Sequence, residues 1–269
     1  MTDDSVKARI GQALCEIEAQ HGCRVLFAVE SGSRAWGFAS ADSDYDVRGV
    51  YVKPIDWYLH LKTDLPDTID KNLPGDLDVS LWDLRKALLQ MAKSNASFLE
   101  WLGSPIVYRD CGMLGQLNEM KSGCFNAVHV AFHYASMFRH AMSSGTEDGF
   151  LPIKKLCYAL RAGLCLRHVM DFEKMPPTKF SDVLAVANLS TEERMAIQEV
   201  LAQKESARES DVVVPDCRLG GILTDRYESL NAHSWRAQGR DDSAYERLES
   251  FFIDVVRAPD WGRSEDDSA

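Results

Sequence analysis

The sequence predicts an α+β fold, in which a small domain of strands and helices is followed by a helical domain. Short apolar runs and apolar–polar alternation, which indicate strands, occur mainly within residues 1–110. Beyond residue 110 the apolar residues recur at helical spacing and strands become scarce. We therefore expect a mixed domain at 1–110, a helical domain at 111–258 and a disordered acidic tail at 259–269.

Composition narrows the class of protein. The net charge of −11 at pH 7 argues against broad, non-specific attraction to nucleic acid, although it leaves room for a local basic pocket. Seven cysteines without a C-x-x-C pair favour reduced thiols over disulfides or structural zinc, and hence a cytoplasmic location. The polar N-terminus predicts no signal peptide, and no apolar run approaches the roughly 20 residues of a membrane span. Composition does not indicate the oligomeric state.

A helix and then a buried strand are predicted at the start of the chain. Apolar residues recur every three or four positions in the first segment, and Gly22 is its predicted stop. These apolar residues are Val6, Ile10, Leu14 and Ile17. The run CRVLFAVES at 23–31 then predicts a strand, which Gly32 ends.

The stretch SDYDVRGVYV at 43–52 alternates in the manner of a second strand. One face would carry Tyr45, Val47, Gly49 and Tyr51, and the other Asp44, Asp46, Arg48 and Val50. An irregular region follows at 53–64. The segments at 67–70 and 77–82 then predict a hairpin around the turn NLPG.

The next segments predict helices. Ser80 is the expected N-cap of a helix at 83–94, with Asp83 completing a capping box, and a second helix is expected at 96–102. After residue 110 helical periodicity recurs at 125–142, 153–172, 180–187, 191–206 and 243–258. The linkers at 143–149 and 173–179 contain the glycine and proline that punctuate helices.

The carboxylates of the second strand suggest a metal site. Asp44 and Asp46 share one face about 6 to 7 Å apart, so they repel each other unless a cation lies between them. Asp78 would join them if its strand lies beside the second strand. Oxygen ligands on rigid strands suit Mg²⁺, with two ions expected and Mn²⁺ as a substitute. The alternative, which we favour for any acidic pair taken alone, is that these aspartates face solvent and cap turns.

The element just upstream of these aspartates favours the metal site over solvent-facing aspartates. The glycine of Gly32-Ser33-Arg34 lets the backbone approach an anion, and the serine can bind phosphate oxygens. Arg34 and Arg48 would supply positive charge for polyphosphate. A phosphate-binding turn beside a metal pair is typical of phosphoryl or nucleotidyl transfer.

The helical region offers further candidates. Lys154, Tyr158 and Arg161 lie at i, i+4 and i+7, hence on one helical face, and Lys155 is adjacent. This face would close over a triphosphate, with Tyr158 stacking on base or sugar, or it would be a solvated basic face. Two other groups are ambiguous or structural: Trp36 and Phe38 would stack on a base or pack in the core, whereas Lys86, Asn95, Glu100 and Trp101 are assigned to packing and support.

The motifs resemble those of the DNA polymerase beta-like nucleotidyltransferase superfamily: Gly32-Ser33, ten intervening residues, Asp44-Tyr45-Asp46, and Asp78 on a later strand. A longer signature resembles the RNA-repair-pathway (RlaP-like) family of predicted nucleotidyltransferases over roughly residues 23–185. That signature comprises GSRAWGFASADSDYDVRGVYV, SLWDLRKAL, SNASFLEWLGSPIVY, IKKLCYALRAGLCLRHV and MPPTKF. Leu81 stands where that family more often has glycine, and it is no proposed ligand.

The resemblance implies a minimal nucleotidyltransferase mixed sheet with flanking helices and an Mg²⁺-dependent enzyme that uses an NTP such as ATP. An acceptor hydroxyl would attack the α-phosphate and release pyrophosphate. The catalytic and metal-binding residues would be Asp44, Asp46 and Asp78. The nucleotide- and phosphate-binding residues would be Gly32, Ser33, Arg34, Ser43, Arg48, Lys154, Lys155, Tyr158 and Arg161.

The acceptor stays open at this point. The family's label suggests RNA repair, with an RNA 3′ end as acceptor, and the acidic net charge favours a short end over a long footprint. A protein Tyr, Ser or Thr hydroxyl, as in nucleotidylating antitoxins, is the second possibility. A third is a non-catalytic nucleotide-binding module that regulates a partner. A metal-dependent phosphohydrolase is a further alternative.

Overall fold

The computed structural model describes residues 3–40, 42–62, 64–206, 211–236 and 242–258, so the predicted tail at 259–269 lies outside the described residues. The helices are α1 (Asp3–His21), α2 (Gly32–Trp36), α3 (Ile55–Tyr58), α4 (Leu84–Ala92), α5 (Ala96–Trp101), α6 (Met113–Cys124), α7 (Ala127–Met142), α8 (Ile153–Phe172), α9 (Phe180–Val186), α10 (Thr191–Ser206) and α11 (Asp242–Arg257). The strands are β1 (Arg24–Glu30), β2 (Tyr45–Val52), β3 (Thr68–Leu73), β4 (Leu77–Asp83), β5 (Val107–Asp110), β6 (Leu151–Pro152) and β7 (Val212–Val213).

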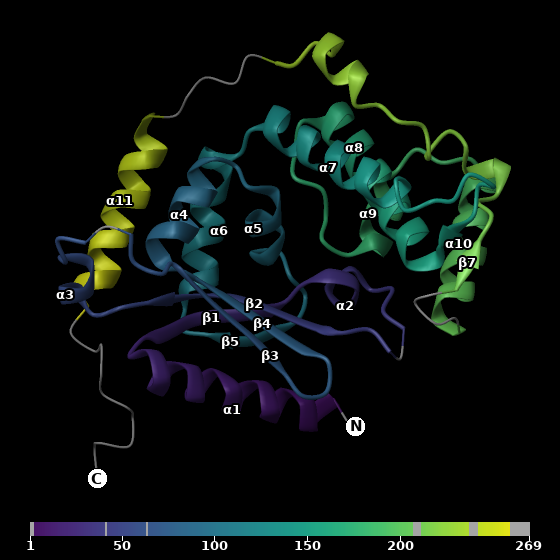
Figure 1. Cartoon of the computed structure of the whole chain (residues 1–269). Coiled ribbons are helices and arrows are strands. Elements are labelled where there is room, and N and C mark those ends of the chain that lie inside the picture. The colour runs from purple at the N-terminus through teal and green to yellow at the C-terminus, as the bar shows by residue number, and fades with distance from the viewer. Residues whose placement is uncertain (1–2, 41, 63, 207–210, 237–241, 259–269) are drawn as a thin grey trace.

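Five strands form a mixed sheet in the order β3-β4-β2-β1-β5 (Figure 1). β2 and β4 run parallel, whereas the other neighbours are antiparallel, including the predicted hairpin of β3 and β4. The predicted α+β class and mixed sheet are therefore confirmed. The sequence did not indicate β5, which is short and lies at the sheet edge.

Helix α1 covers one face of the sheet, below it in Figure 1. The four residues that predicted this helix are all buried against the sheet, and Ile10 and Leu14 are fully inaccessible. They meet one side of the alternating strand β2, represented by Val47 and Tyr51. The opposite side of β2, represented by Val50, belongs to the core beneath the remaining helices. The predicted alternation of β2 is thus confirmed, and Asp46 faces away from α1.

The helices after β4 cover the other face. α4, α5 and α6 lie above the sheet in Figure 1, and α7 and α8 pack along each other beside them. One hydrophobic core joins sheet residues such as Phe27 and Val29 with helical residues such as Leu156 and Leu160. Residues on both sides of position 110 share this core, and the predicted domain boundary there stays a prediction. Both strands beyond residue 110, β6 and β7, have two residues each in the described part.

The predicted N-cap of α4 is wrong. Ser80 lies inside β4, where its hydroxyl donates to Asp70 at 2.6 Å. β4 continues to Asp83, whose carboxylate accepts the backbone N–H of Arg85 at 2.9 Å and caps α4. The strand continues this far because its alternating apolar residues match the buried face of the sheet, and this packing overrides the local capping pattern.

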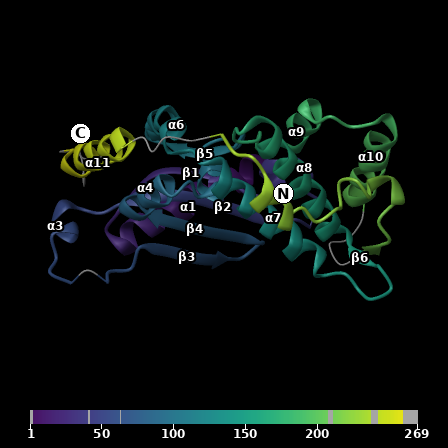
Figure 2. The same ribbon diagram turned by 90° about the horizontal axis from the view of Figure 1, so that it is seen from above.

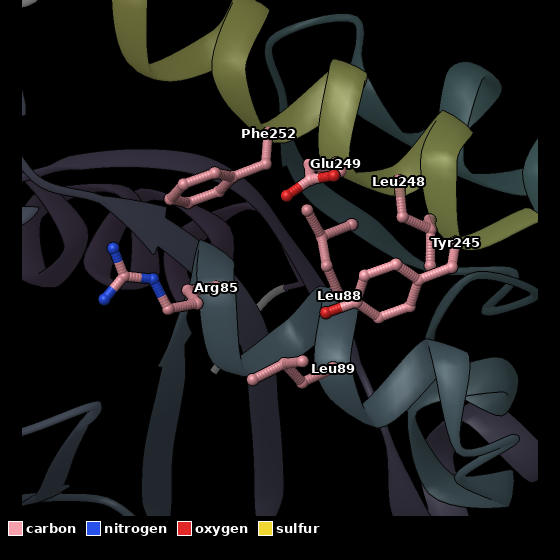
Figure 3. Close-up of a pocket in the computed structure, with 7 residues that line it drawn as sticks. All are labelled: Arg85, Leu88, Leu89, Tyr245, Leu248, Glu249 and Phe252. Carbon is pink, nitrogen blue, oxygen red and sulfur yellow. The ribbon is translucent and has the colours of Figure 1, made fainter.

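The segment after α10 crosses the molecule. Residues 211–236 run above α7 and α8, and α11 then packs against α4 and α6 at the opposite end from α10 (Figures 1 and 2). A cavity of about 350 Å³ lies between α4 and α11 (Figure 3). Its lining comprises Arg85, Leu88, Leu89, Tyr245, Leu248, Glu249 and Phe252. None of these is a predicted site residue. Among the described helices, none is long and apolar enough to cross a lipid bilayer.

Candidate active site

Two aspartates meet on neighbouring parallel strands. Asp46 of β2 and Asp78 of β4 are direct register partners, so both side chains project from the same face of the sheet. Arg48, two residues further along β2, projects from that face as well. Its Nη2 atom donates to Asp46 Oδ1 at 3.0 Å and to Asp78 Oδ2 at 2.6 Å. One guanidinium group therefore bridges the two carboxylates that the sequence placed in a metal site.

The pair requires positive charge. Burial raises the pKa of Asp46, and the charges of Asp78 and Asp44 raise it further, whereas Arg48 and Lys154 oppose this rise. The Asp46 side chain is 27% exposed and that of Asp78 is 39% exposed, so a cation from solvent can reach both. Arg48 supplies the cation in this structure.

Asp44 is not held against that pair. It is exposed and lies one residue before β2, although its charge acts on Asp46. Within the described part of the chain, no group of three or more His, Cys, Asp or Glu side chains is placed to bind one metal ion. Among the described residues the structure brings Asp46 and Asp78 together, and the convergence of all three carboxylates on a metal ion stays a prediction.

The donor set nevertheless fits a hard divalent cation. Carboxylate oxygens on rigid neighbouring strands are the ligands that Mg²⁺ prefers, and the contact with Arg48 shows that the pair attracts a cation. Asp46 and Asp78 would hold such an ion, and Asp44 is the candidate for a further ligand.

The Gly-Ser element lies directly against Asp46. Gly32 has a φ of +61°, and a Cβ at this position would lie 2.2 Å from Asp46 Oδ2. The backbone N–H of Ser31 also donates to the Asp46 carbonyl at 2.8 Å. Only glycine fits here, because any larger residue would displace the carboxylate and strain the backbone. Gly32 and Ser33 form the first turn of the short helix α2, at the position where the sequence predicted a phosphate-binding turn.

Arg34 and Ser43 hold the loop that leads into β2. Arg34 donates from Nε to the Asp44 carbonyl at 3.0 Å and from Nη2 to the Ser43 carbonyl at 2.6 Å. Its guanidinium carbon lies 3.7 Å from the centroid of the Tyr45 ring. Ser43 is 3% exposed, and its hydroxyl accepts the N–H of Ser40 at 3.0 Å. Both residues lie beside the carboxylates, and their contacts with phosphate stay predictions.

Arg161 does not lie on a basic surface. It is fully buried and donates to Glu100 Oε1 at 2.8 Å, which corrects its predicted contact with phosphate because no part of it is accessible to a ligand. The burial has a simple cause, since α8 is packed on several sides and most of its residues are covered. The helical spacing places Arg161 and Lys154 on the same face of α8. It does not show which part of that face is covered by other helices.

Glu100 organises a buried polar network that the sequence assigned only to support. Besides Arg161 it accepts the Tyr134 hydroxyl at 2.6 Å and the Trp36 indole N–H at 3.2 Å. The Arg161 guanidinium carbon lies 4.3 Å from the centroid of the Trp36 ring. Trp36 is the last residue of α2, so this network fixes the helix that begins with Gly32.

The remaining predicted residues lie at the start of α8. The charge of Lys154 acts on Asp46, and Lys155 beside it is partly exposed. The Tyr158 ring contacts Trp36 edge-on, with centroids 5.0 Å apart. Trp36 and Phe38 are each 7% exposed, which favours core packing over base stacking for these two rings.

Glu30, which the sequence analysis missed, lies behind the carboxylate pair. It is fully buried at the end of β1, accepts the backbone N–H of Asp46 at 2.7 Å, and accepts the Tyr108 hydroxyl. Burial raises its pKa to about 7. The available signal was an acidic residue at the end of an otherwise apolar strand.

This burial predicts a pH-dependent stability. Because the folded-state pKa of Glu30 exceeds the unfolded value of 4.5, the folded protein binds the proton more tightly. Protonated Glu30 therefore contributes up to about 3 kcal/mol to the free energy of unfolding. This contribution is fully present below pH 4.5 and is lost as the pH rises through 7. Glu30→Gln should remove this decline in the free energy of unfolding, measured by urea denaturation between pH 4.5 and 8.

The matched control is Glu16→Gln on the exposed side of α1, which should keep the wild-type pH dependence. Parallel pH profiles of the wild type and Glu30→Gln would contradict the assignment to Glu30.

Comparisons with known proteins agree with the motifs of this site. A family model described as the RNA repair pathway DNA polymerase beta family matches residues 6–254. The uncharacterized protein YcgL of Bacillus subtilis (strain 168) is 35% identical over 208 residues, which are 77% of this chain and 80% of the relative. A crystal structure of a nucleotidyltransferase-like protein from Exiguobacterium sibiricum 255-15 aligns over 92% of this chain and 76% of its own at 12% identity, with a TM-score of 0.28, which is too low to assign anything.

The family match spans nearly the whole chain and includes every predicted site residue. It confirms the family resemblance and the enzyme class that the motifs predicted. The chain therefore belongs to the RNA repair pathway DNA polymerase beta family, and its class is that of the nucleotidyltransferases.

Proposed function

We propose that the protein is an Mg²⁺-dependent enzyme that transfers NMP from an NTP, such as ATP, to an acceptor hydroxyl. One observation carries the proposal: the carboxylates of Asp46 and Asp78 lie side by side, and Gly32 lies directly against the first of them. This arrangement puts a carboxylate pair next to a stretch of backbone that an anion can approach closely.

The proposal assigns phosphate binding and metal binding to different residues of the site. Gly32 and Ser33 would bind the phosphates through the backbone and the serine hydroxyl, and Lys154 and Lys155 would add positive charge from α8. Asp46 and Asp78 would hold Mg²⁺, which when bound supplies the charge that stabilises the attacking and leaving oxygens.

The proposed reaction is a displacement at the α-phosphorus of the NTP. The acceptor oxygen forms a bond to this phosphorus, and the bond from the α-phosphorus to the oxygen that bridges to the β-phosphate breaks. Pyrophosphate leaves, and the proton of the acceptor hydroxyl passes to the Asp78 carboxylate and from there to solvent. Asp78, the more exposed of the paired aspartates, would help to activate this hydroxyl.

Arg48 would change partners during this cycle. In this structure it neutralises Asp46 and Asp78. A divalent ion on the same carboxylates would take over that neutralisation, and the guanidinium would then be available to a phosphate oxygen. The predicted role of Arg48 in phosphate binding belongs to that state.

An RNA 3′ end is the acceptor that we favour, and the family description supports it. The net charge of −11 favours a short end over an extended duplex. Transfer to a protein hydroxyl would place the label on protein, and a non-catalytic module would bind NTP without releasing pyrophosphate. The cytoplasmic location also stays a prediction.

The test is incubation of the pure protein with each α-labelled NTP, Mg²⁺ and either short RNAs or lysate protein. Asp46→Asn and Asp78→Asn should each lower transfer by about 100-fold or more, because each removes a metal ligand. Asp70→Asn is the matched control, since Asp70 is an exposed aspartate of β3 in the same sheet, and it should keep wild-type transfer.

Labelled RNA would support the favoured acceptor, and labelled protein would replace it by the second one. Wild-type turnover in either Asp46→Asn or Asp78→Asn would contradict the metal site.

The buried network around Glu100 gives a second prediction. Trp36→Phe keeps an aromatic ring but removes the indole N–H that binds Glu100, so it loosens α2 with a smaller loss of packing than a change to alanine. We expect the KM for NTP to rise about 5-fold while kcat stays within about twofold, because the change acts on phosphate binding.

Trp101→Phe is the control, because this tryptophan of α5 is similarly buried and packs against Trp82 of β4 and Phe98 of α5. Both variants should lose similar Tm, but the control should keep the wild-type KM. An unchanged KM in Trp36→Phe would show that the network serves stability alone.

A further inference from the structure

Lys204 is a buried cation that the proposed site does not yet use. It lies in the last turn of α10 and is 1% exposed. Its ammonium group donates a hydrogen bond to the Ser40 hydroxyl, 164 residues away in the sequence. A lysine is almost never fully buried without a partner of opposite charge, so this position requires a physical explanation.

Within the described part of the chain, the charge of Lys204 is only partly offset. No carboxylate of the described residues forms an ion pair with it, and the Ser40 hydroxyl is neutral. The carboxyl end of α10 contributes roughly half a negative charge. Burying a charge without a full counter-charge destabilises the folded state, and an apolar side chain could fill the same space without this cost. A structural role alone therefore does not explain a lysine here.

The hydrogen bond of Lys204 leads to the loop that carries Asp44. Ser40 and Ser43 close a turn at 40–43, in which the Ser43 N–H donates to the Ser40 carbonyl at 3.1 Å and the two hydroxyls lie 3.1 Å apart. Arg34 holds the other side of this turn through the Ser43 carbonyl. Two cations therefore flank the turn immediately before Asp44.

Lys204 also lies near the start of α8. Burial raises the pKa of the Cys157 thiol to about 12, and the charge of Lys204 opposes that rise, so the two groups are within electrostatic range. Cys157 is one helical turn beyond Lys154, whose charge acts on Asp46. The ammonium group thus contacts Ser40 and lies within electrostatic range of the first two turns of α8.

We infer that Lys204 is a positioning residue of the donor site, whose charge is balanced when the polyphosphate of the donor binds in front of the turn at 40–43. This inference rests on the proposed function and extends it to α10, a region outside the sequence signature. Lys204 acts through the buried serines of the turn, and its charge attracts the polyphosphate across a region from which water is excluded.

The test measures binding of inorganic tripolyphosphate with Mg²⁺ by isothermal titration calorimetry, together with the Tm of the ligand-free protein. Lys204→Met removes the charge and keeps the length of the side chain. We expect its dissociation constant to rise about 10-fold, with a Tm at or above that of the wild type, because an incompletely balanced charge has been removed. Lys121→Met is the matched control, a partly buried lysine of α6, and it should bind within twofold of the wild type.

Three other results of these measurements would contradict either the role of Lys204 or the donor site itself. Equal dissociation constants for the wild type and Lys204→Met would overturn the inference and leave the proposed function standing. Weaker binding together with a lowered Tm would also overturn it, since that pattern marks a structural role. Failure of the wild type itself to bind tripolyphosphate would instead count against the proposed donor site.

Discussion

Two aspartates on neighbouring parallel strands, Asp46 and Asp78, repel each other unless a cation lies between them. The sheet leaves them little freedom to separate, because the register of β2 and β4 fixes their backbones side by side. Arg48 supplies the cation here, and the proposed enzyme would exchange it for Mg²⁺. The tight approach of Gly32 to Asp46 then brings the backbone that we propose to bind phosphate next to the position of such an ion.

The helices stabilise this arrangement from behind. α2 has only five residues and is too short to be stable alone. Glu100 fixes its end through Trp36, and Arg161 forms an ion pair with Glu100 in the core. Lys204 and Arg34 flank the next turn in a similar way. The helical residues beyond position 110 thus belong to the architecture of the site and do not merely follow it.

Local pattern predicted the fold and the carboxylate pair well. The alternation of β2 placed Asp46 on one face of its strand, and Asp78 was expected to join it only if its own strand lay beside β2, which is where β4 lies. Local pattern could not predict contacts between residues that are far apart in the sequence. The partnership of Arg161 with Glu100 spans 61 positions and depends on which helices cover α8. The sequence also misplaced the cap of α4, because burial of alternating apolar residues extended β4 to Asp83.

A crystal structure of the protein with Mn²⁺ and a non-hydrolysable NTP analogue tests the central claim most directly. Mn²⁺ scatters X-rays anomalously, so an anomalous difference map locates the ion. We predict an anomalous peak coordinated by Asp46 and Asp78, with the Arg48 guanidinium moved away from both carboxylates. Arg48 still bridging the two aspartates, with no metal peak beside them and the analogue bound elsewhere, would contradict the account.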